Sequence, residues 1–208
     1  MVTSPEQKHW DSVYTRKAAD NVSWYRPHLD ESLRFLIAAG IERTAAIIDV
    51  GGGASTFVDD LLDRGYSNVT VLDLSGAALE VARQRLGERA SGVHWLCADV
   101  TRAELPEKSF DFWHDRAVFH FLTDAAARSR YIDLVRKSVR PGGHIVIATF
   151  GPHGPEQCSG LDVLRFTPDA IHSEFGDEFT KVADATEVHK TPWGAEQEFV
   201  YCYCRLPK

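Results

Sequence analysis

Three aspartates stand at the ends of short apolar runs along the chain. Asp49 comes two residues before a row of glycines, Asp73 follows a run that begins at residue 69, and Asp99 follows one that begins at residue 93. A carboxylate at the tip of a strand can accept hydrogen bonds from both hydroxyls of a ribose, and another can accept from an adenine amino group. One such residue alone is usually a cap or a solvated group. Three in succession indicate a nucleoside site.

Three consecutive glycines, Gly51, Gly52 and Gly53, join the first apolar run to a helical pattern. Glycine lets the backbone turn sharply and approach a ligand closely, and the first strand-to-helix crevice of a doubly wound sheet is where nucleotides bind. A dinucleotide fingerprint requires a further glycine where the chain has Thr56, and a P-loop requires a Gly-Lys pair, which the sequence lacks. The glycine pattern therefore argues against a nicotinamide dehydrogenase and excludes a P-loop protein.

The spacing of apolar residues predicts the elements that position these groups. Alternating strands and helices predict a parallel sheet with right-handed crossovers, and a C-terminal hairpin adds an antiparallel strand. The predicted class is α/β, a Rossmann-like, doubly wound, mostly parallel seven-stranded sheet with an antiparallel C-terminal strand hairpin. Strands are expected at residues 45–50, 69–73, 93–97, 110–113, 144–150, 179–189 and 198–205, and helices at residues 55–64, 77–86, 123–139 and from Thr167.

The first 44 residues precede this alternation. This segment is rich in aromatic side chains, among them Trp10, Tyr14, Trp24 and Tyr25. We expect residues 1–44 to form an N-terminal helical extension, and residues 45–208 to form the main domain. The extension either packs on that domain or forms a partial lid over its site.

Taken in order, the motifs resemble those of class I S-adenosylmethionine-dependent methyltransferases, over about residues 45–150. Ser55 stands where the family has its third glycine. The resemblance implies that residues 45–208 form a methyltransferase domain with S-adenosyl-L-methionine as its cofactor. The residues that carry it are Asp49-Val50-Gly51-Gly52-Gly53, Asp73, Ala98-Asp99-Val100, Phe110-Asp111 and Arg140-Pro141-Gly142-Gly143.

Two shorter segments carry narrower likenesses. Trp10-Asp11 and residues 22–25 are similar to small bacterial enzymes and to the lysine methyltransferases that modify citrate synthase or elongation factors. Asp115-Arg116 is similar to the thiopurine and thiol methyltransferases.

The family resemblance also implies which side chains hold the cofactor. Asp49 and the three glycines would face its methionine part, Asp73 its ribose, and Asp99 with Val100 its adenine, while His114 would border the methyl group. The full expected set is Trp24, Asp49, Gly51, Gly52, Gly53, Asp73, Leu74, Ser75, Asp99, Val100 and His114.

Candidate catalytic residues follow the fourth strand: Asp115, Arg116 and His120. A sulfonium already activates its methyl group, so the protein mainly aligns a nucleophile and excludes water, and no acid or base is obligatory. His120 could be a general base, since its unperturbed pKa is about 6.5. Its neighbours Phe119 and Phe121 fit a packed histidine equally well. Arg116 either binds an anionic substrate group or pairs with a nearby aspartate.

Composition excludes several classes of function. The chain has 208 residues, a net charge of −7 and no basic run, which argues against nucleic-acid binding. No run of about 18 apolar residues or signal peptide is present, so we expect no membrane span and a cytoplasmic location. The four cysteines are expected to be buried, reduced thiols, with metal or metalloid binding, or a soft substrate at Cys158, as the alternatives. They are Cys97, Cys158, Cys202 and Cys204.

The expected function is methyl transfer to N, O or S of a small-molecule acceptor, by a monomer or homodimer. Residues 114–117 lack the Asn/Asp-Pro-Pro-Tyr/Phe motif of amino-methylating nucleic-acid enzymes. Residues 150–153 lack the Asp-Asn of magnesium-dependent catechol-type enzymes, and we expect no metal. A protein lysine N-methyltransferase is the first alternative. The net negative charge of the chain agrees with it, because a lysine substrate is cationic. An NAD-dependent oxidoreductase and a catalytically silent cofactor-binding module are the others.

Overall fold

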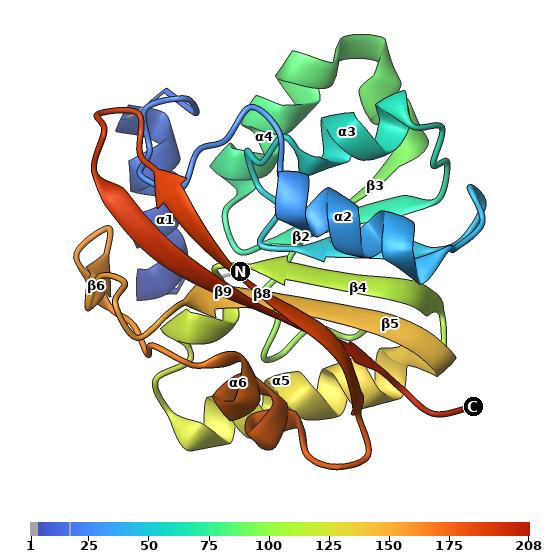
Figure 1. Ribbon diagram of the computed structural model, residues 1–208. Coiled ribbons are helices and arrows are strands. Elements are labelled where there is room, and N and C mark those ends of the chain that lie inside the picture. Colours follow the sequence, from blue (N-terminus) through green and yellow to red (C-terminus); the bar gives the residue numbers. More distant parts are fainter. Residues whose placement is uncertain (1–3, 17) are drawn as a thin grey trace.

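A seven-stranded sheet runs through the molecule, with helices on both faces (Figure 1). The structure is a computed structural model that describes residues 4–16 and 18–208. Strands β1 to β5 are parallel, β9 is antiparallel to β5, and β8 is antiparallel to β9, which confirms the predicted fold class. The strands, in sheet order, are β3 (Val93–Cys97), β2 (Val69–Asp73), β1 (Ile47–Val50), β4 (Phe110–Arg116), β5 (Val139–Phe150), β9 (Glu196–Arg205) and β8 (Thr180–Lys190).

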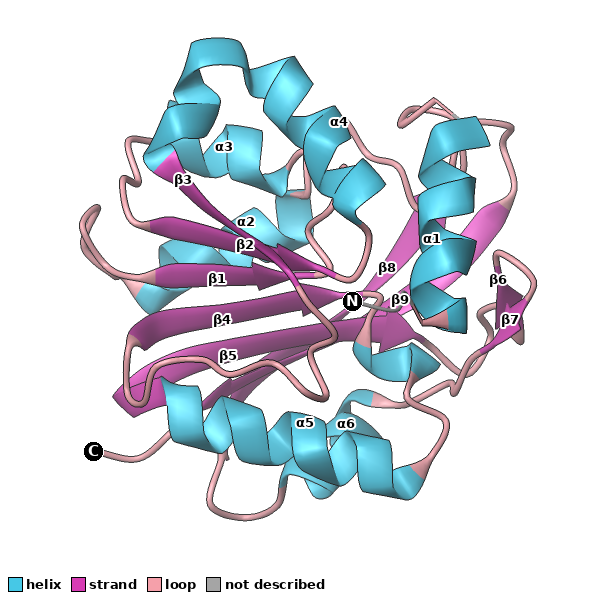
Figure 2. Cartoon of the chain, turned by 180° about the vertical axis from the view of Figure 1, so that it is seen from behind, coloured by secondary structure: helices cyan, strands magenta, loops and turns pink. Residues whose placement is uncertain are grey.

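Helices α2, α3 and α4 cover one face of the sheet, and α5 and α6 cover the other (Figures 1 and 2). Helix α1 instead crosses the carboxyl ends of the parallel strands, beside the small hairpin of β6 and β7. In the described part of the chain, no helix is long and apolar enough to cross a membrane. The remaining elements are α1 (Pro5–Arg16), α2 (Asp30–Ala39), α3 (Phe57–Asp63), α4 (Gly76–Leu86), η1 (Gly87–Gly92), η2 (Phe119–Phe121), α5 (Ala125–Ser138), β6 (Gln157–Cys158), β7 (Leu161–Asp162) and α6 (Pro168–Phe175).

The strand order places a crevice at the carboxyl end of β1. This strand pairs with β2 on one side and with β4 on the other, so that Val50 lies opposite both Leu72 and Asp115. The chain leaves β1 into α3 on one face and leaves β4 towards α5 on the other face. Open α/β sheets bind ligands at such a reversal of strand order.

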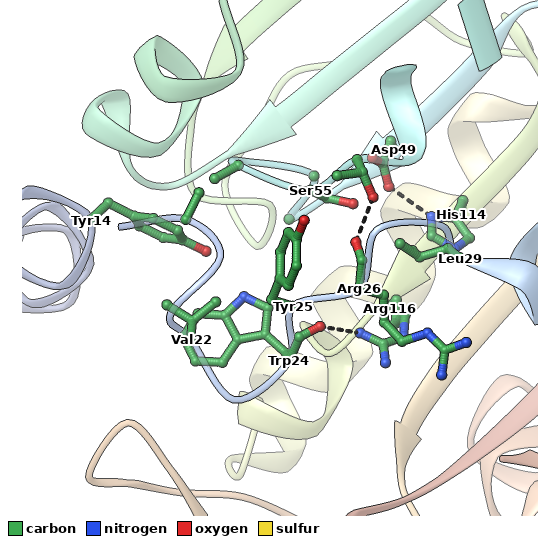
Figure 3. Close-up of a pocket in the computed structure, with 15 residues that line it drawn as sticks. Tyr14, Val22, Trp24, Tyr25, Arg26, Leu29, Asp49, Ser55, His114 and Arg116 are labelled. Atoms are coloured by element: carbon green, nitrogen blue, oxygen red, sulfur yellow. Dashed lines mark hydrogen bonds and ion pairs between the residues drawn. The ribbon is translucent and has the colours of Figure 1, made fainter. Parts of the chain in front are cut away.

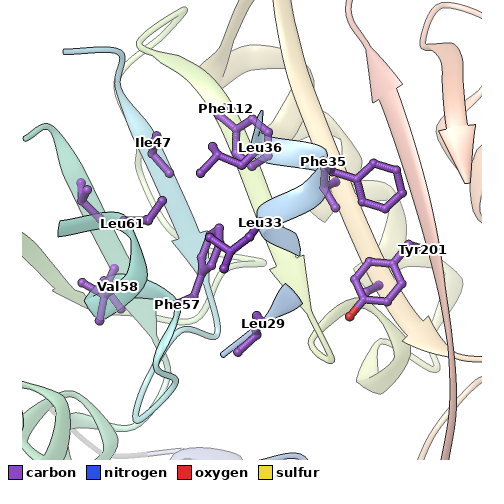
Figure 4. Packing of buried hydrophobic residues seen from close by; sticks show 14 of the residues in the cluster. Leu29, Leu33, Phe35, Leu36, Ile47, Phe57, Val58, Leu61, Phe112 and Tyr201 are labelled. Carbon is purple, nitrogen blue, oxygen red and sulfur yellow. The ribbon is translucent and has the colours of Figure 1, made fainter. Parts of the chain in front are cut away.

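Strand β1 is buried along its whole length because both faces of the sheet are covered. Ile47 packs with Phe35, Leu36 and Phe57 in the cluster beneath α2 and α3 (Figure 4). Ile48 belongs to the second cluster, on the side of α5. The two clusters fix the sheet between its helices and so fix the positions of the strand ends.

The structure differs from the sequence prediction at a few places. Strand β5 begins at Val139, five residues earlier than predicted, because Val139 pairs with Phe110 across a register shift. Burial of all four cysteines was predicted, and this is wrong for Cys97, which is exposed at the end of the edge strand β3. Cys202 and Cys204 are buried on one face of β9, with their sulfur atoms 3.4 Å apart.

Neighbouring residues of α2 provide a test of this core. Leu36 is 0% exposed and Ile37 is 64% exposed. We expect Leu36→Ala to lower the free energy of unfolding by about 2–5 kcal/mol, because it leaves a cavity between α2 and the sheet. Ile37→Ala should change it by less than about 0.5 kcal/mol. Urea denaturation of the two variants checks this, and equal losses would contradict the placement of α2.

Candidate active site

Asp49 lies at the crevice and is held by a buried network. Its Oδ1 atom is 2.7 Å from His114 Nδ1, and His114 Nε2 is 2.8 Å from the Ser32 hydroxyl of α2. A ring nitrogen that faces a carboxylate must carry the hydrogen, so Nδ1 donates to Asp49. The other carboxylate oxygen, Oδ2, is buried without a hydrogen-bond partner among the described residues. Such an oxygen is costly unless a ligand donates to it.

The glycine loop approaches these carboxylates so closely that a side chain would not fit. A Cβ atom on Gly52 would lie 2.4 Å from Asp49 Oδ2, and one on Gly53 would lie 2.5 Å from Asp73 Oδ2. Gly51 has a φ of +68°, in the left-handed region that glycine adopts without steric cost. The loop can therefore pass close to Asp49 and Asp73 only because it carries no side chains.

Asp73 ends β2 as predicted, and its carboxylate is buried. The amide of Ser75 donates to Asp73 Oδ1 over 2.7 Å. Burial, and to a smaller extent the carboxylates of Asp49 and Asp11, raise the pKa of Asp73 to about 7, although the hydrogen bond from the Ser75 amide acts to lower it. The carboxyl group thus ionises near neutral pH in the absence of a ligand.

Two cavities meet above these strand ends. The smaller, about 40 Å³, lies over Asp49, His114 and the glycine loop (Figure 3). The larger, about 580 Å³, extends from Asp73 past Asp99 to α1 and to the β6–β7 hairpin. Four residues line both: Tyr14, Gly51, Trp24 and Arg116.

Arg116 is fixed at the junction of the two cavities. Its Nε donates to the Tyr201 hydroxyl, its Nη1 donates to the carbonyl of Trp24 (Figure 3), and its guanidinium lies 4.1 Å from the centre of the Phe199 ring. Its Nη2 is buried without a hydrogen-bond partner, and within the described ranges no carboxylate forms an ion pair with it. A cation held in this way favours an anionic ligand.

Asp115 and His120 do not line either cavity. Asp115 accepts hydrogen bonds from the Tyr131 hydroxyl and from the amides of Val118 and Phe119. Burial raises the pKa of Asp115 to about 7. These bonds hold the turn after β4.

His120 is equally enclosed. Its Nδ1 accepts from the amide of Phe150 over 3.2 Å, and its ring lies against those of Phe121 and Phe150. Burial, together with the charge of Arg116, lowers the pKa of His120 to about 3, so the ring is neutral at physiological pH.

Most of the predicted cofactor residues come together around the two cavities. Gly53 and Ser75 lie behind the lining and support Asp73. Thr56, Phe121 and Leu161 also line a cavity, although nothing in the sequence around them marks them as site residues. The cavity-lining members of the predicted set are Trp24, Asp49, Gly51, Gly52, Asp73, Leu74, Asp99, Val100 and His114.

The described part of the chain contains no group of three or more His, Cys, Asp or Glu side chains that could hold a metal ion. The polar groups at the crevice are instead arranged for an organic ligand. Asp49 Oδ2 and Asp73 can accept hydrogen bonds, and Arg116 Nη2 can donate one.

Comparison with known proteins agrees with this geometry. A family model described as a methyltransferase domain matches residues 48–147, from β1 into β5. EEF1A lysine methyltransferase 2 of Danio rerio is 27% identical over 157 residues, which cover 69% of this chain and 67% of that protein. Malonyl-acyl-carrier-protein O-methyltransferase 1 of Ilyobacter polytropus is 27% identical over 177 residues, which cover 83% of this chain and 61% of that protein. The chain thus spans about two thirds or less of these two relatives.

Among solved structures, N-methyltransferase NodS from Bradyrhizobium japonicum WM9 in complex with S-adenosyl-L-homocysteine superimposes with a TM-score of 0.72 and 19% identity. The match covers 95% of this chain and 98% of that one, and it shows that the two share a fold. The family match, together with the fold and the crevice, identifies residues 48–147 as a class I S-adenosylmethionine-dependent methyltransferase domain. The resemblance seen in the sequence is confirmed, and S-adenosylmethionine is the cofactor of this family.

The raised pKa of Asp73 predicts a pH dependence of ligand binding. Ribose hydroxyls donate better to an ionised carboxylate, so if Asp73 holds the ribose, as the family resemblance implies, binding of S-adenosylhomocysteine deprotonates Asp73 below about pH 7. We expect the association constant to fall by up to about tenfold per unit as the pH drops from 7 to 5, and to level off above about 8.

Calorimetric titration across this pH range measures the effect. Asp73→Asn is the matched variant, because it keeps the shape of the side chain but does not titrate; its binding should be weaker and almost independent of pH. A wild-type affinity that stays flat from pH 5 to 8 would contradict the assignment.

Proposed function

We propose that the chain transfers the methyl group of S-adenosylmethionine to an N, O or S atom of a small-molecule acceptor. The observation that carries this proposal is the pair of unpartnered atoms of opposite charge around the smaller cavity, Asp49 Oδ2 and Arg116 Nη2. They match the ammonium and the carboxylate of an amino acid, and S-adenosylmethionine carries such a zwitterion at one end. A dinucleotide would bring a diphosphate instead, which the Asp49 carboxylate would repel.

The remaining predicted residues fit the nucleoside part of the same ligand. Asp73 would accept from the ribose hydroxyls, and Leu74, Asp99 and Val100 line the cavity beyond it, where the adenine would lie. Thr101 donates to Asp99 Oδ1 through both its amide and its hydroxyl, over 2.8 and 2.7 Å, which orients that carboxylate.

The bound cofactor would supply an activated methyl group, and the chain would supply position and a dry environment. Tyr14, Trp24 and Arg116 stand where the two cavities meet, and so they border the reacting centre in this proposal. Asp115 would act by holding the turn that follows β4, and neutral His120 by filling the space behind it. Neither is required to move a proton for this reaction.

A small acceptor is favoured by the side chains that surround the larger cavity. Beyond the nucleoside positions, the cavity continues between Trp10 of α1, Phe121, and Cys158 and Leu161 of the β6–β7 hairpin. Helix α1 and the hairpin lie together over the carboxyl end of the sheet in both views of the molecule (Figures 1 and 2). Pockets that enclose a ligand in this way are typical of small-molecule sites.

Protein lysine methylation is the second candidate. It is favoured by the Danio rerio relative, which is named as an EEF1A lysine methyltransferase, and by two carboxylates at the outer part of the larger cavity, those of Glu6 and Asp162. A lysine side chain would have to enter past α1 to reach the same centre.

The role of Arg116 can be tested with two ligands that differ only at one end. S-adenosylhomocysteine has the zwitterionic amino acid, and 5′-methylthioadenosine lacks it. We expect Arg116→Met to weaken binding of the first by about 10- to 100-fold, because a charge-assisted hydrogen bond is lost, and to leave the second within about twofold. Arg130→Met, which removes an exposed cation of α5 that lines neither cavity, is the control and should bind both ligands as the wild type does. Equal losses for the two ligands in Arg116→Met would refute this role.

The acceptor class can be tested with methyl-tritiated S-adenosylmethionine. Cell extract is separated into a fraction below about 3 kDa and a protein fraction, and each is incubated with the enzyme. We expect tritium to appear in a small-molecule product that chromatography separates from S-adenosylmethionine, and not to enter protein above the level of an Asp73→Asn control. Label that accumulates in a protein band instead would favour the lysine candidate.

A further inference from the structure

Asp11 of helix α1 makes polar contacts that link this helix to the cofactor site. None of the helix's described residues is buried, yet Asp11 reaches the first turn of α4. Its Oδ1 atom accepts from the Ser75 hydroxyl over 2.6 Å and from the amide of Ala77 over 3.2 Å. A carboxylate at a helix N-terminus is stabilised by the unpaired amides and by the helix dipole.

Ser75 connects this contact to the ribose site. Its amide donates to Asp73 over 2.7 Å, its hydroxyl donates to Asp11, and the same hydroxyl accepts from the amide of Ala78 as the cap of α4. A single residue thus touches both carboxylates. Two hydrogen bonds through Ser75 thus connect Asp73 to Asp11.

The residues beside Asp11 on α1 form part of a cluster that we call the aromatic wall, which consists of Trp10, Tyr14, Trp24 and Phe121. Trp10 lies 5.2 Å from Phe121 and 5.8 Å from Trp24 between ring centres, and Tyr14 lies 6.3 Å from Trp24, all edge to face. All four side chains line the larger cavity. Two of them come from α1, so the wall is complete only when α1 is in place.

We infer that Asp11 is a positioning residue. Through Ser75, it couples binding of the cofactor's ribose at Asp73 to docking of α1. Docking of α1 then completes the aromatic wall of the acceptor pocket. The inference rests on the proposed function, because it takes Asp73 as the ribose carboxylate. It assigns α1 a role in ordering the reaction. The cofactor binds first, α1 then docks, and the acceptor pocket exists only in the docked state.

The contrasting interpretation is that Asp11 serves only as a second cap for α4. Loss of a cap would lower the stability of α4 by about 1 kcal/mol, and this loss would be the same with and without ligand. Coupling instead predicts that substitution of Asp11 reduces the protection of α1 by the ligand. Loss of a cap alone would leave that protection unchanged.

Hydrogen–deuterium exchange of the full chain, with and without S-adenosylhomocysteine, separates the two. In the wild type we expect the ligand to slow exchange of the α1 amides at least about tenfold. In Asp11→Ala, residues 49–53 and 73–78 should still be protected by the ligand, while the protection of α1 falls below about twofold. Asp11→Asn should be intermediate, because its amide oxygen still accepts from Ser75. The ligand-induced change in tryptophan emission, to which Trp10 and Trp24 contribute, should shrink in the same order.

Asp20→Ala is the matched control. It removes an exposed carboxylate shortly after the end of α1 and should retain the wild-type protection. Equal protection of α1 in Asp11→Ala and in the wild type would overturn the inference and leave the proposed function standing. Absence of ligand protection at residues 49–53 and 73–78 in the wild type would overturn the proposed function, and the inference with it.

Discussion

The site depends on keeping two carboxylates, Asp49 and Asp73, buried side by side at the ends of neighbouring parallel strands. Desolvation makes this arrangement costly, and the structure offsets the cost with local donors: His114 for one carboxylate and the amide of Ser75 for the other. The glycine loop can pass between them only because it has no side chains, since a Cβ on Gly53 would meet Asp73 Oδ2 at 2.5 Å. The β1–α3 connection, the position of α2 behind His114 and the cap of α4 all follow from this requirement.

The same arrangement explains why the site favours one cofactor class. Among the described residues, one oxygen of Asp49 and one nitrogen of Arg116 have no hydrogen-bond partner in a buried setting, which is costly for the protein alone. In the proposed function a zwitterion bridges them and offsets this cost. Arg116 is held by a hydroxyl, a carbonyl and an aromatic face, not by a carboxylate, so that its charge stays available. Preorganisation of this kind lets a modest number of residues position a reaction that needs no obligatory acid or base.

Much of the fold could be predicted from the sequence because its signals are local. The alternation of apolar runs with helical spacing predicts the parallel sheet. The glycines of residues 51–53, followed along the chain by Asp73 and Asp99, predict the edge of the sheet at which the site lies. What escaped prediction depends on contacts distant in sequence: Ser32 meets His114 across 82 residues, and Asp11 meets Ser75 across 64. The exposure of Cys97 could not be predicted because it follows from the strand order, which leaves β3 at the edge. Motif spacing likewise does not reveal that Arg116 has no carboxylate partner.

The most direct test of the central claim is calorimetric titration of the wild-type chain with S-adenosylhomocysteine and, separately, with NADH. The account predicts a single site for S-adenosylhomocysteine with a dissociation constant on the order of micromolar, about −8 kcal/mol, and no heat of binding with NADH. Tight binding of NADH, with none of S-adenosylhomocysteine, would contradict it, because the crevice would then accept a diphosphate beside Asp49 in place of a zwitterion between Asp49 and Arg116.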